Sequence, residues 1–290
     1  MQVYTAAEAV RRASDGWRSE GLTVGLVPTM GALHEGHLSL VRRAAEECDR
    51  VIVSIFVNPT QFAPGEDFEA YPRDLERDGT LLSKAGCDAV FAPSTTDMYG
   101  AGGTDLDSGE RTFIEVGEIG AVLEGADRPG HFRGVATVVA MLLLAVRPDR
   151  AYFGEKDFQQ LQVIKKMVRE LLIGVEIFGC SVVREPDGLA MSSRNAYLSE
   201  EERRAAPVLF RALEAGGKLV SNGVRDAEKV SLEIEEILRS ESLVKLRYVA
   251  VVDSETLAPL GEIGVGRSGR ALVAAQVGQT RLIDNVALGE

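Results

Sequence analysis

Two histidines lie three residues apart in a short glycine-containing segment, P-T-M-G-A-L-H-E-G-H, at residues 28–37. His34 and His37 can point the same way if this segment leads into a helix, because residues three apart share a helix face. Their ring N–H groups could donate to a triphosphate and follow the negative charge that builds on a leaving pyrophosphate. Gly31 and Gly36 would let the backbone approach a phosphate, which a helix N-terminus also attracts. The segment therefore predicts a phosphate site.

A solvated loop with incidental histidines and a zinc site are the alternatives for residues 28–37. All three histidines of the chain fall in polar segments that contain glycine, which disfavours an incidental placement. No third ligand stands at a recognisable spacing, which disfavours zinc.

Two further segments carry side chains suited to a nucleotide. In G-E-K-D-F-Q-Q, residues 154–160, Lys156 is a point charge suited to a phosphate, and Asp157 can cap a helix or hold a ribose hydroxyl. The segment D-G-L-A-M-S-S-R-N, residues 187–195, supplies two hydroxyls and a guanidinium at residues 192–194, which can fold over phosphates as a lid. The alternatives are an exposed, charged helix start for the first segment and a polar interdomain linker for the second.

Two supporting segments are N-P-T-Q-F at residues 58–62 and R-P-G-H-F-R-G-V at residues 128–135. The Gln61 amide carries donors and an acceptor, so it can bind both a carbonyl and a hydroxyl. His131 lies between two glycines and suits a structural role in a loop as well as it suits a ligand contact. The G-x-G-x-x-G match at residues 264–269 lies between predicted strands, without the helix that a dinucleotide site requires, so we expect no nucleotide there.

The elements that must position these residues alternate along the first part of the chain. Predicted strands, apolar on both faces, span residues 23–27, 51–57, 88–92 and 151–154, and predicted helices span 5–18, 37–48, 73–85, 135–146 and 157–171. This alternation is typical of a parallel sheet covered by helices, and ligands bind at the carboxyl ends of such strands. We predict a Rossmann-like, doubly wound α/β catalytic domain over residues 1–183.

The pattern changes in the second part of the chain. Ser199 with Glu202 forms a capping box that opens a helix to about residue 220, as Thr5 with Glu8 does for the first helix of the chain. A helix at 226–239 and strands at 246–252, 270–277 and 280–284 follow. We predict a smaller α+β domain over residues 184–290 that acts as a lid. Residues 95–110, rich in Gly, Asp, Ser and Thr, predict a surface loop.

The composition is that of an ordinary soluble globular protein. The chain has 290 residues, and 32 basic against 44 acidic side chains give a net charge of −12. That surplus of acid disfavours nucleic acid or an anionic membrane as a partner. The longest apolar run, residues 135–146, is too short to cross a bilayer and predicts a buried helix. The first residues lack a basic region followed by an apolar stretch, so we expect no signal peptide. The cysteines are odd in number and far apart, as suits reduced thiols in a cytoplasmic protein.

With these segments identified, the chain resembles a known family. P-T-M-G-A-L-H-E-G-H resembles the H-x-G-H signature of the nucleotidyltransferases related to class I aminoacyl-tRNA synthetases, and M-S-S-R-N resembles their lid-loop signature. Together with F-V-N-P-T-Q-F, Y-P-R-D, R-P-G-H-F-R-G-V, F-G-E-K-D-F-Q-Q and R-L-I-D-N, these segments are similar to the pantothenate synthetase family. They run in family order from residue 24 to residue 285 and cover essentially the whole chain.

The resemblance implies an ATP-dependent ligation. The carboxylate of pantoate attacks the α-phosphorus of ATP, which gives pantoyl adenylate and pyrophosphate. The amine of β-alanine then attacks the acyl carbon and releases AMP and pantothenate. Such chemistry needs positioning and charge neutralisation rather than a protein nucleophile, in agreement with the side chains above. The resemblance also implies Mg²⁺ with the ATP and a homodimer.

The resemblance further implies roles for individual residues. His37 is the general acid on the leaving side. Gln61 and Gln160 hold pantoate, Gln61 also contacts β-alanine, and Asp78 is a candidate metal contact. The implied catalytic set is His34, His37, Lys156, Ser192, Ser193 and Arg194. The implied ATP site is Met30, Gly31, Ala32, Leu33, His34, Glu35, Gly36, His37, Gly154, Glu155, Lys156, Asp157, Val183, Met191, Ser192, Ser193 and Arg194.

Two alternatives remain. Another enzyme of the superfamily would adenylylate a different carboxylate or a phosphate ester; a tRNA synthetase among these would need a basic RNA-binding module, which the net charge of −12 disfavours. A nucleotide-binding protein without catalysis would be expected to lose His37, Lys156 or Arg194, and all three are present.

Overall fold

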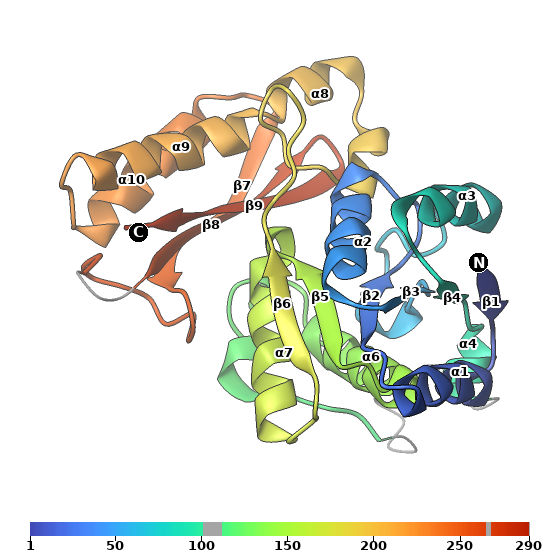
Figure 1. Ribbon diagram of the computed structural model, residues 1–290. Helices are drawn as coiled ribbons and strands as arrows, with labels where there is room; N and C mark the ends of the chain where they lie inside the picture. Colours follow the sequence, from blue (N-terminus) through green and yellow to red (C-terminus); the bar gives the residue numbers. More distant parts are fainter. Residues whose placement is uncertain (101–111, 265–267, 290) are drawn as a thin grey trace. The chain divides into compact units, whose positions relative to one another are not determined.

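The computed structural model describes residues 1–100, 112–264 and 268–289. Among the described residues up to 181, six parallel strands form one sheet in the order β1-β4-β3-β2-β5-β6 (Figure 1). The strands are β1 (Gln2–Tyr4), β2 (Val24–Thr29), β3 (Arg50–Ile55), β4 (Ala89–Phe91), β5 (Arg150–Gly154) and β6 (Glu176–Cys180). The chain builds outward from β2 through β3 to β4, and then returns to the other side of β2 to form β5. The order of the sheet therefore reverses between β2 and β5, where open α/β sheets bind their ligands.

Helices cover both faces of this sheet. They are α1 (Ala7–Ser19), α2 (Glu35–Glu47), α3 (Leu75–Ala85), α6 (His131–Val146) and α7 (Phe158–Glu170), with the shorter α4 (Thr95–Tyr99) and α5 (Glu124–Asp127). Helices α2 and α3 pack together on one face, and α1 and α6 pack together on the other (Figure 1). The predicted doubly wound α/β fold is confirmed.

Apolar side chains of α2 and α3 form one core with the strands. Val27, Val53 and Val90 of the sheet pack with Val41 of α2 and Leu82 of α3, and all five are fully buried. On the other face α6 carries no charged residue after Arg133 and is buried along nearly its whole length, as its apolar run predicts. Within the described part of the chain, no helix is both long and apolar enough to cross a membrane.

The described residues from 182 onward form a three-stranded antiparallel sheet with helices on it. Strands β7 (Val244–Asp253), β8 (Gly269–Val277) and β9 (Thr280–Leu288) form a meander in that order. Helices α9 (Val208–Ser221) and α10 (Ala227–Arg239) pack on each other and on this sheet, and α8 (Glu200–Ala205) precedes them. Buried Leu213, Ile234 and Val273 belong to their shared apolar core. The predicted α+β character of this part is confirmed.

The chain divides into two compact units. The first comprises residues 1–155 and 159–181, and the second comprises residues 156–158 and 182–290. The sequence predicts one boundary, at 183/184, whereas the chain enters the second unit twice. The first of these two segments covers only residues 156–158 and includes Lys156.

Three local predictions at helix and strand ends need correction. Helix α1 begins after Ala6 with no side-chain cap, so the capping box proposed for Thr5 is wrong, whereas that of Ser199 with Glu202 is confirmed at α8. The single helix predicted after Ser199 is two, because Pro207 stands between α8 and α9. Strand β2 continues through Pro28, because β5 pairs with β2 only at residues 25–26 and no ladder bond is lost.

The predicted surface loop at residues 95–110 begins as a helix. Ser94 and Asp97 form a capping box, with the Ser94 hydroxyl accepting from the Asp97 N–H at 3.1 Å, and α4 follows. Residues 101–111 lie outside the described part of the chain, as does Gly266 of the G-x-G-x-x-G match.

Candidate active site

Three of the segments singled out in the sequence follow three adjacent strands. The histidine segment follows β2, the segment with Gln61 follows β3 through a 3₁₀ turn (Pro59–Gln61), and residues 155–160 follow β5. Since β3, β2 and β5 are parallel neighbours, their carboxyl ends lie at the same edge of the sheet. The sheet thus brings the first two segments, Gly154 and Glu155 to the place where its strand order reverses.

His34 and His37 form a capping box at the start of α2. Nδ1 of His34 accepts the Gly36 N–H at 3.1 Å, and Nδ1 of His37 accepts the His34 N–H at 3.4 Å. The rings lie side by side with centroids 4.1 Å apart. Because Nδ1 accepts in both rings, the proton of each neutral imidazole is on Nε2. The structure therefore offers two neighbouring Nε2–H donors, and α2 begins at Glu35 rather than at His37.

A buried carboxylate holds the loop that precedes these histidines. Asp78 on α3 accepts the Ala32 N–H at 2.8 Å and the Leu33 N–H at 2.9 Å, and its side chain is 1% exposed. Gly31 has a φ of +83°, and a Cβ there would lie 3.0 Å from the Asp78 carboxylate. Residue 31 is a glycine because its φ is positive and the Asp78 carboxylate packs against it.

The backbone N–H groups of this loop, which were expected to bind phosphate, donate to partners within the protein. The N–H of Gly31 donates to the Thr29 hydroxyl at 3.2 Å, and the next two N–H groups donate to Asp78. The N–H groups of His34 and Gly36 donate to the two imidazoles. These five N–H groups are therefore engaged within the protein, and the geometry favours the imidazole Nε2 groups over them as candidate donors to an anion.

Asp78 does not have the surroundings expected of a metal ligand. Each of its oxygens accepts one backbone N–H group, and Oδ1 also lies 3.4 Å from the Arg77 guanidinium. Among the described residues, no three His, Cys, Asp or Glu side chains are grouped so as to hold a metal ion. The geometry favours a loop-holding role for Asp78 over the metal contact.

Gln61 is fixed through its side chain. Its Nε2–H donates to the Met30 sulfur at 3.2 Å, which joins it to the histidine segment, and its Oε1 accepts from Asn58 at 3.1 Å. Asn58 is 1% exposed and also accepts from the Tyr99 hydroxyl at 2.7 Å. A Cβ at Gly134 would lie 2.3 Å from the Thr60 carbonyl oxygen, so α6 reaches this turn only through a glycine. Asn58 was not singled out from the sequence.

His131 holds the backbone of Gln61. Its Nδ1–H donates to the Gln61 carbonyl at 2.8 Å, and its Nε2 accepts from Arg128 at 3.2 Å. Burial, and then the charge of Arg128, lower the pKa of His131 to about 4, so the ring is neutral at ordinary pH. Arg128 forms a two-pronged ion pair with Glu66 at 2.7 and 2.6 Å. Of the two roles that the sequence left open for His131, the structure favours the structural one.

The segment after β5 places its polar residues in different units. Gly154 and Glu155 belong to the first unit, and Lys156 and Asp157 to the second. The Lys156 ammonium lies 3.7 Å from the Asp157 carboxylate and its side chain is 21% exposed. Gln160 stands in the first turn of α7 in the first unit and is half-buried.

The buried neighbour of Gln160 has a different role. The Gln159 amide donates to the carbonyls of Ile119 at 2.9 Å and Val122 at 2.7 Å, and accepts from the Glu124 N–H at 3.0 Å. Of the two adjacent glutamines, Gln159 therefore holds protein backbone and Gln160 is the one suited to a ligand.

A tight hairpin brings Val183 to the lid segment. The Met191 N–H donates to the Val183 carbonyl at 3.0 Å, and Arg184 pairs with Ala190 one step inward. The Ser192 hydroxyl then caps a 3₁₀ turn (Ser193–Tyr197) by accepting the Arg194 N–H at 3.3 Å. The candidate adenosine contact and residues 191–194 are thus brought together within the second unit, although the sequence separates them.

The three cysteines are buried free thiols. Burial raises the pKa of Cys87 to about 12, and burial also raises the pKa of Cys48 and of Cys180. A thiol must ionise to act as a nucleophile, so none of the three is a candidate for covalent catalysis.

Comparison with known proteins decides the family. The family model for pantoate–β-alanine ligase matches residues 2–287. The chain belongs to the pantoate–β-alanine ligase family.

Relatives within this family align over nearly their whole length. The pantothenate synthetase of Rubrobacter xylanophilus is 68% identical over 279 residues, which cover 96% of each chain. A crystal structure of pantothenate synthetase from Thermus thermophilus superimposes with a TM-score of 0.89 at 48% identity and covers 99% of each chain. A crystal structure of the Francisella tularensis pantoate–β-alanine ligase, described as complexed with β,γ-ATP and β-alanine, superimposes with a TM-score of 0.78 at 34% identity. The match covers 99% of this chain and 97% of that chain. This protein is an ATP-dependent pantoate–β-alanine ligase, as its motifs predict.

Proposed function

We propose that this ligase works through a pantoyl adenylate. A pantoate carboxylate oxygen bonds to the α-phosphorus of ATP as the bond to pyrophosphate breaks. The amine of β-alanine then bonds to the acyl carbon, AMP leaves with the bridging oxygen, and the amine gives up its proton to form the amide. Two adjacent imidazole Nε2–H donors at the end of β2 support this proposal best, since donors there would stabilise the charge that builds on the departing phosphates.

The residues at the sheet edge suit binding of pantoate, β-alanine and the phosphates of ATP. His37 would donate from Nε2 to the leaving pyrophosphate, with His34 beside it. Gln61, held by Asn58 and His131, would bind pantoate and β-alanine, and Gln160 would bind pantoate from α7. The Met30 side chain already contacts the Gln61 amide, which fits a shared site for the nucleotide and the carboxylate that attacks it.

The remaining candidates suit the nucleotide. Lys156 would contact a phosphate, with Gly154, Glu155, Asp157 and Val183 bordering the adenosine. Residues 191–194 would close over the phosphates and supply Ser192, Ser193 and Arg194 only in the closed state. Protection of this segment from proteolysis on addition of ATP checks that closure, and equal cleavage with and without ATP would contradict it.

Mg²⁺ would enter with ATP. The donors at the histidine loop are N–H groups, which contact phosphate oxygens rather than a cation, and Asp78 is engaged by the loop backbone. The ion would then be held by phosphate oxygens and water, as Mg²⁺ commonly is, and would neutralise charge on the pyrophosphate. We further propose that the enzyme is a cytoplasmic homodimer.

Pyrophosphate–ATP exchange tests the adenylate directly. Labelled pyrophosphate is incubated with enzyme, ATP, Mg²⁺ and pantoate in the absence of β-alanine, with an incubation lacking pantoate as control. We expect label in ATP only when pantoate is present. Absence of exchange together with AMP formation on addition of β-alanine would overturn a separate adenylation step, and absence of both would overturn pantoate as the substrate.

A further inference from the structure

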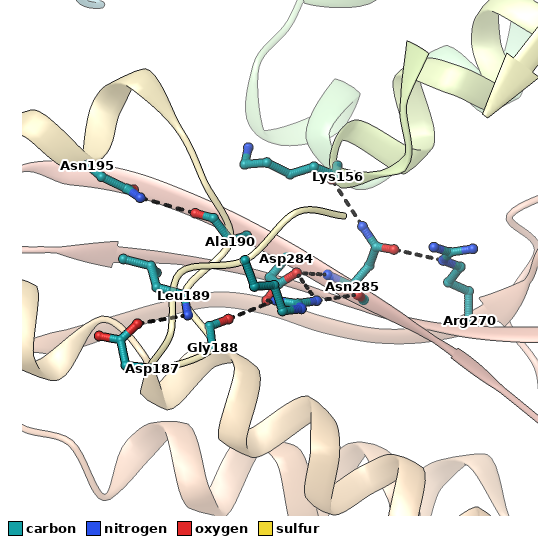
Figure 2. A network of polar contacts seen from close by, with 10 residues as sticks. Lys156, Asp187, Gly188, Leu189, Ala190, Asn195, Arg270, Asp284 and Asn285 are labelled. Carbon is teal, nitrogen blue, oxygen red and sulfur yellow. Dashed lines mark hydrogen bonds and ion pairs between the residues drawn. The ribbon is translucent and has the colours of Figure 1, made fainter. Parts of the chain in front are cut away.

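The motif at residues 281–285, R-L-I-D-N, contains a side chain that reaches the backbone of Lys156. Asn285 lies on β9 and is 2% exposed. Its Nδ2–H donates to the carbonyl oxygen of Lys156 at 3.0 Å (Figure 2). Both residues belong to the second unit, and 129 positions separate them in the sequence. The bond therefore anchors the backbone of Lys156 to β9.

Arg270 on β8 fixes which way the Asn285 amide faces. Its Nε–H donates to Oδ1 of Asn285 at 2.7 Å, so the amide nitrogen is turned toward Lys156 (Figure 2). A flipped amide would place its N–H₂ against this donor and its oxygen against the Lys156 carbonyl. The Arg270 guanidinium also lies 3.9 Å from the ring centroid of Phe158. Residues 156–158 are thus held at both ends by the second unit.

The neighbouring residue makes the anchor rigid. Asp284 is 3% exposed and accepts from Arg184 at 2.6 and 3.0 Å, and it also accepts the Asn285 N–H at 2.8 Å. Arg184 stacks on the Phe210 ring, 3.8 Å from its centroid. The Asn285 backbone therefore has little freedom to follow a displaced Lys156.

We propose that Asn285 is a positioning residue that determines where the Lys156 ammonium stands. This inference rests on the proposed contact between Lys156 and a phosphate of ATP. The Lys156 ammonium stands at the end of a four-carbon stem of limited length, so the position of the Lys156 backbone limits which phosphate oxygen it can reach. Displacing a charge by about 1 Å can slow a reaction by about 10²-fold. Asn285 thus acts on the reaction through Lys156 without touching a substrate.

A double-mutant cycle on kcat/KM for ATP tests the proposal. The variants are Asn285→Ala, Lys156→Ala and the two combined. We expect Asn285→Ala to lower kcat/KM by about tenfold to a hundredfold, and Lys156→Ala to lower it further. In the Lys156→Ala background we expect Asn285→Ala to cause no additional loss, because the group that it positions is already gone.

Val286→Ala is the matched control, since Val286 is the next residue on β9 and packs against the apolar core of the second unit. Its effect on kcat/KM should be small and equal in both backgrounds. If Asn285→Ala does not fold, Arg270→Lys replaces it in the cycle, because it keeps the charge and loses the Nε–H donor to Asn285.

The outcomes separate the two proposals. An unchanged kcat/KM in Lys156→Ala would overturn the phosphate role of Lys156 and the positioning role with it. An impaired Lys156→Ala, together with a harmless Asn285→Ala or with losses that multiply, would overturn the positioning role alone. The positioning role is supported if the Asn285 or Arg270 variant lowers kcat/KM in the parent enzyme but not in the Lys156→Ala background, while Val286→Ala has a small and equal effect in both.

Discussion

The chemistry of His34 and His37 depends on what their Nδ1 atoms accept. Each Nδ1 receives a backbone N–H at the start of α2, so each ring is turned with its Nε2 away from the helix backbone. One pair of side chains therefore caps a helix and, in the proposed function, would also donate to phosphate. A substitution of either histidine removes both functions unless the new side chain restores the cap.

His37→Asn and His37→Ala separate these functions. Asn can accept the His34 N–H in place of Nδ1 but has nothing at the position of Nε2, whereas Ala lacks both. We expect both variants to slow pantoate adenylation by about 10²-fold or more. Only His37→Ala should also lose about 1 kcal/mol of unfolding free energy through the missing cap. Exchange rates and urea unfolding measure the two effects, and near-normal exchange in His37→Asn would contradict the role of Nε2.

His131 makes stability depend on acid. Its pKa is about 4 in the folded protein and 6.5 in an unfolded chain, so folding favours the neutral ring. Its contribution is complete above pH 6.5 and is lost as the pH falls toward 4. Between pH 7.5 and pH 5 this costs about 2 kcal/mol. His131→Asn keeps a donor for the Gln61 carbonyl and does not titrate. Between pH 7.5 and pH 5, its unfolding free energy, measured in urea, should therefore fall by about 2 kcal/mol less than that of the parent protein. Equal losses in both proteins would exclude this titration.

At the scale of elements, α3 controls the shape of the loop after β2. Asp78 reaches across 46 positions to hold the Ala32 N–H, and the bond fixes a loop in which Gly31 and Ala32 both have positive φ. Ala32 at +51° is strained for a residue with a Cβ. The loop that carries His34 thus depends on a carboxylate from another helix.

Asp78→Asn tests that dependence. One acceptor oxygen becomes an N–H₂ group that faces a backbone donor, so one of the two loop bonds is lost and a buried group is left unsatisfied. We expect KM for ATP to rise about tenfold, as a loss of about 1.4 kcal/mol in binding implies, with KM for β-alanine nearly unchanged. Asp74→Asn, which changes the exposed N-cap of α3 at the same helix end, is the control. Equal rises in both constants would contradict a local effect on the loop.

Sequence patterns predicted these elements well and their side-chain bonds poorly. Alternating apolar strands and helices indicated the α/β fold, because burial on both faces leaves a clear signal. The spacing of His34 and His37 indicated a shared face, but not that Nδ1 is used for capping. The contacts of Asp78 with the loop and of Asn285 with Lys156 join distant segments, and no local pattern reports such a pairing.

At the scale of the whole molecule, charge bears on the proposed homodimer. Each chain carries a net charge of −12, so two chains repel each other over about 30 Å at low salt and about 8 Å at physiological salt. We expect sedimentation to give twice the mass of the chain, with tighter association as salt is raised from about 0.01 to about 0.15 M. A single-chain mass across that range would contradict the dimer, and association that weakens with salt would indicate an interface held by ion pairs.

Residues 156–158 belong to the second unit although the residues on either side of them belong to the first. This arrangement constrains which hybrid chains can be built from this enzyme and its relatives. A hybrid joined at residue 181 would combine Lys156 and Phe158 from one parent with strands β8 and β9 from the other. Such a hybrid would keep the anchor only if the second parent supplies an asparagine and an arginine at the positions of Asn285 and Arg270. The two units are therefore expected to be inherited together, even though a single peptide junction separates nearly all of their residues.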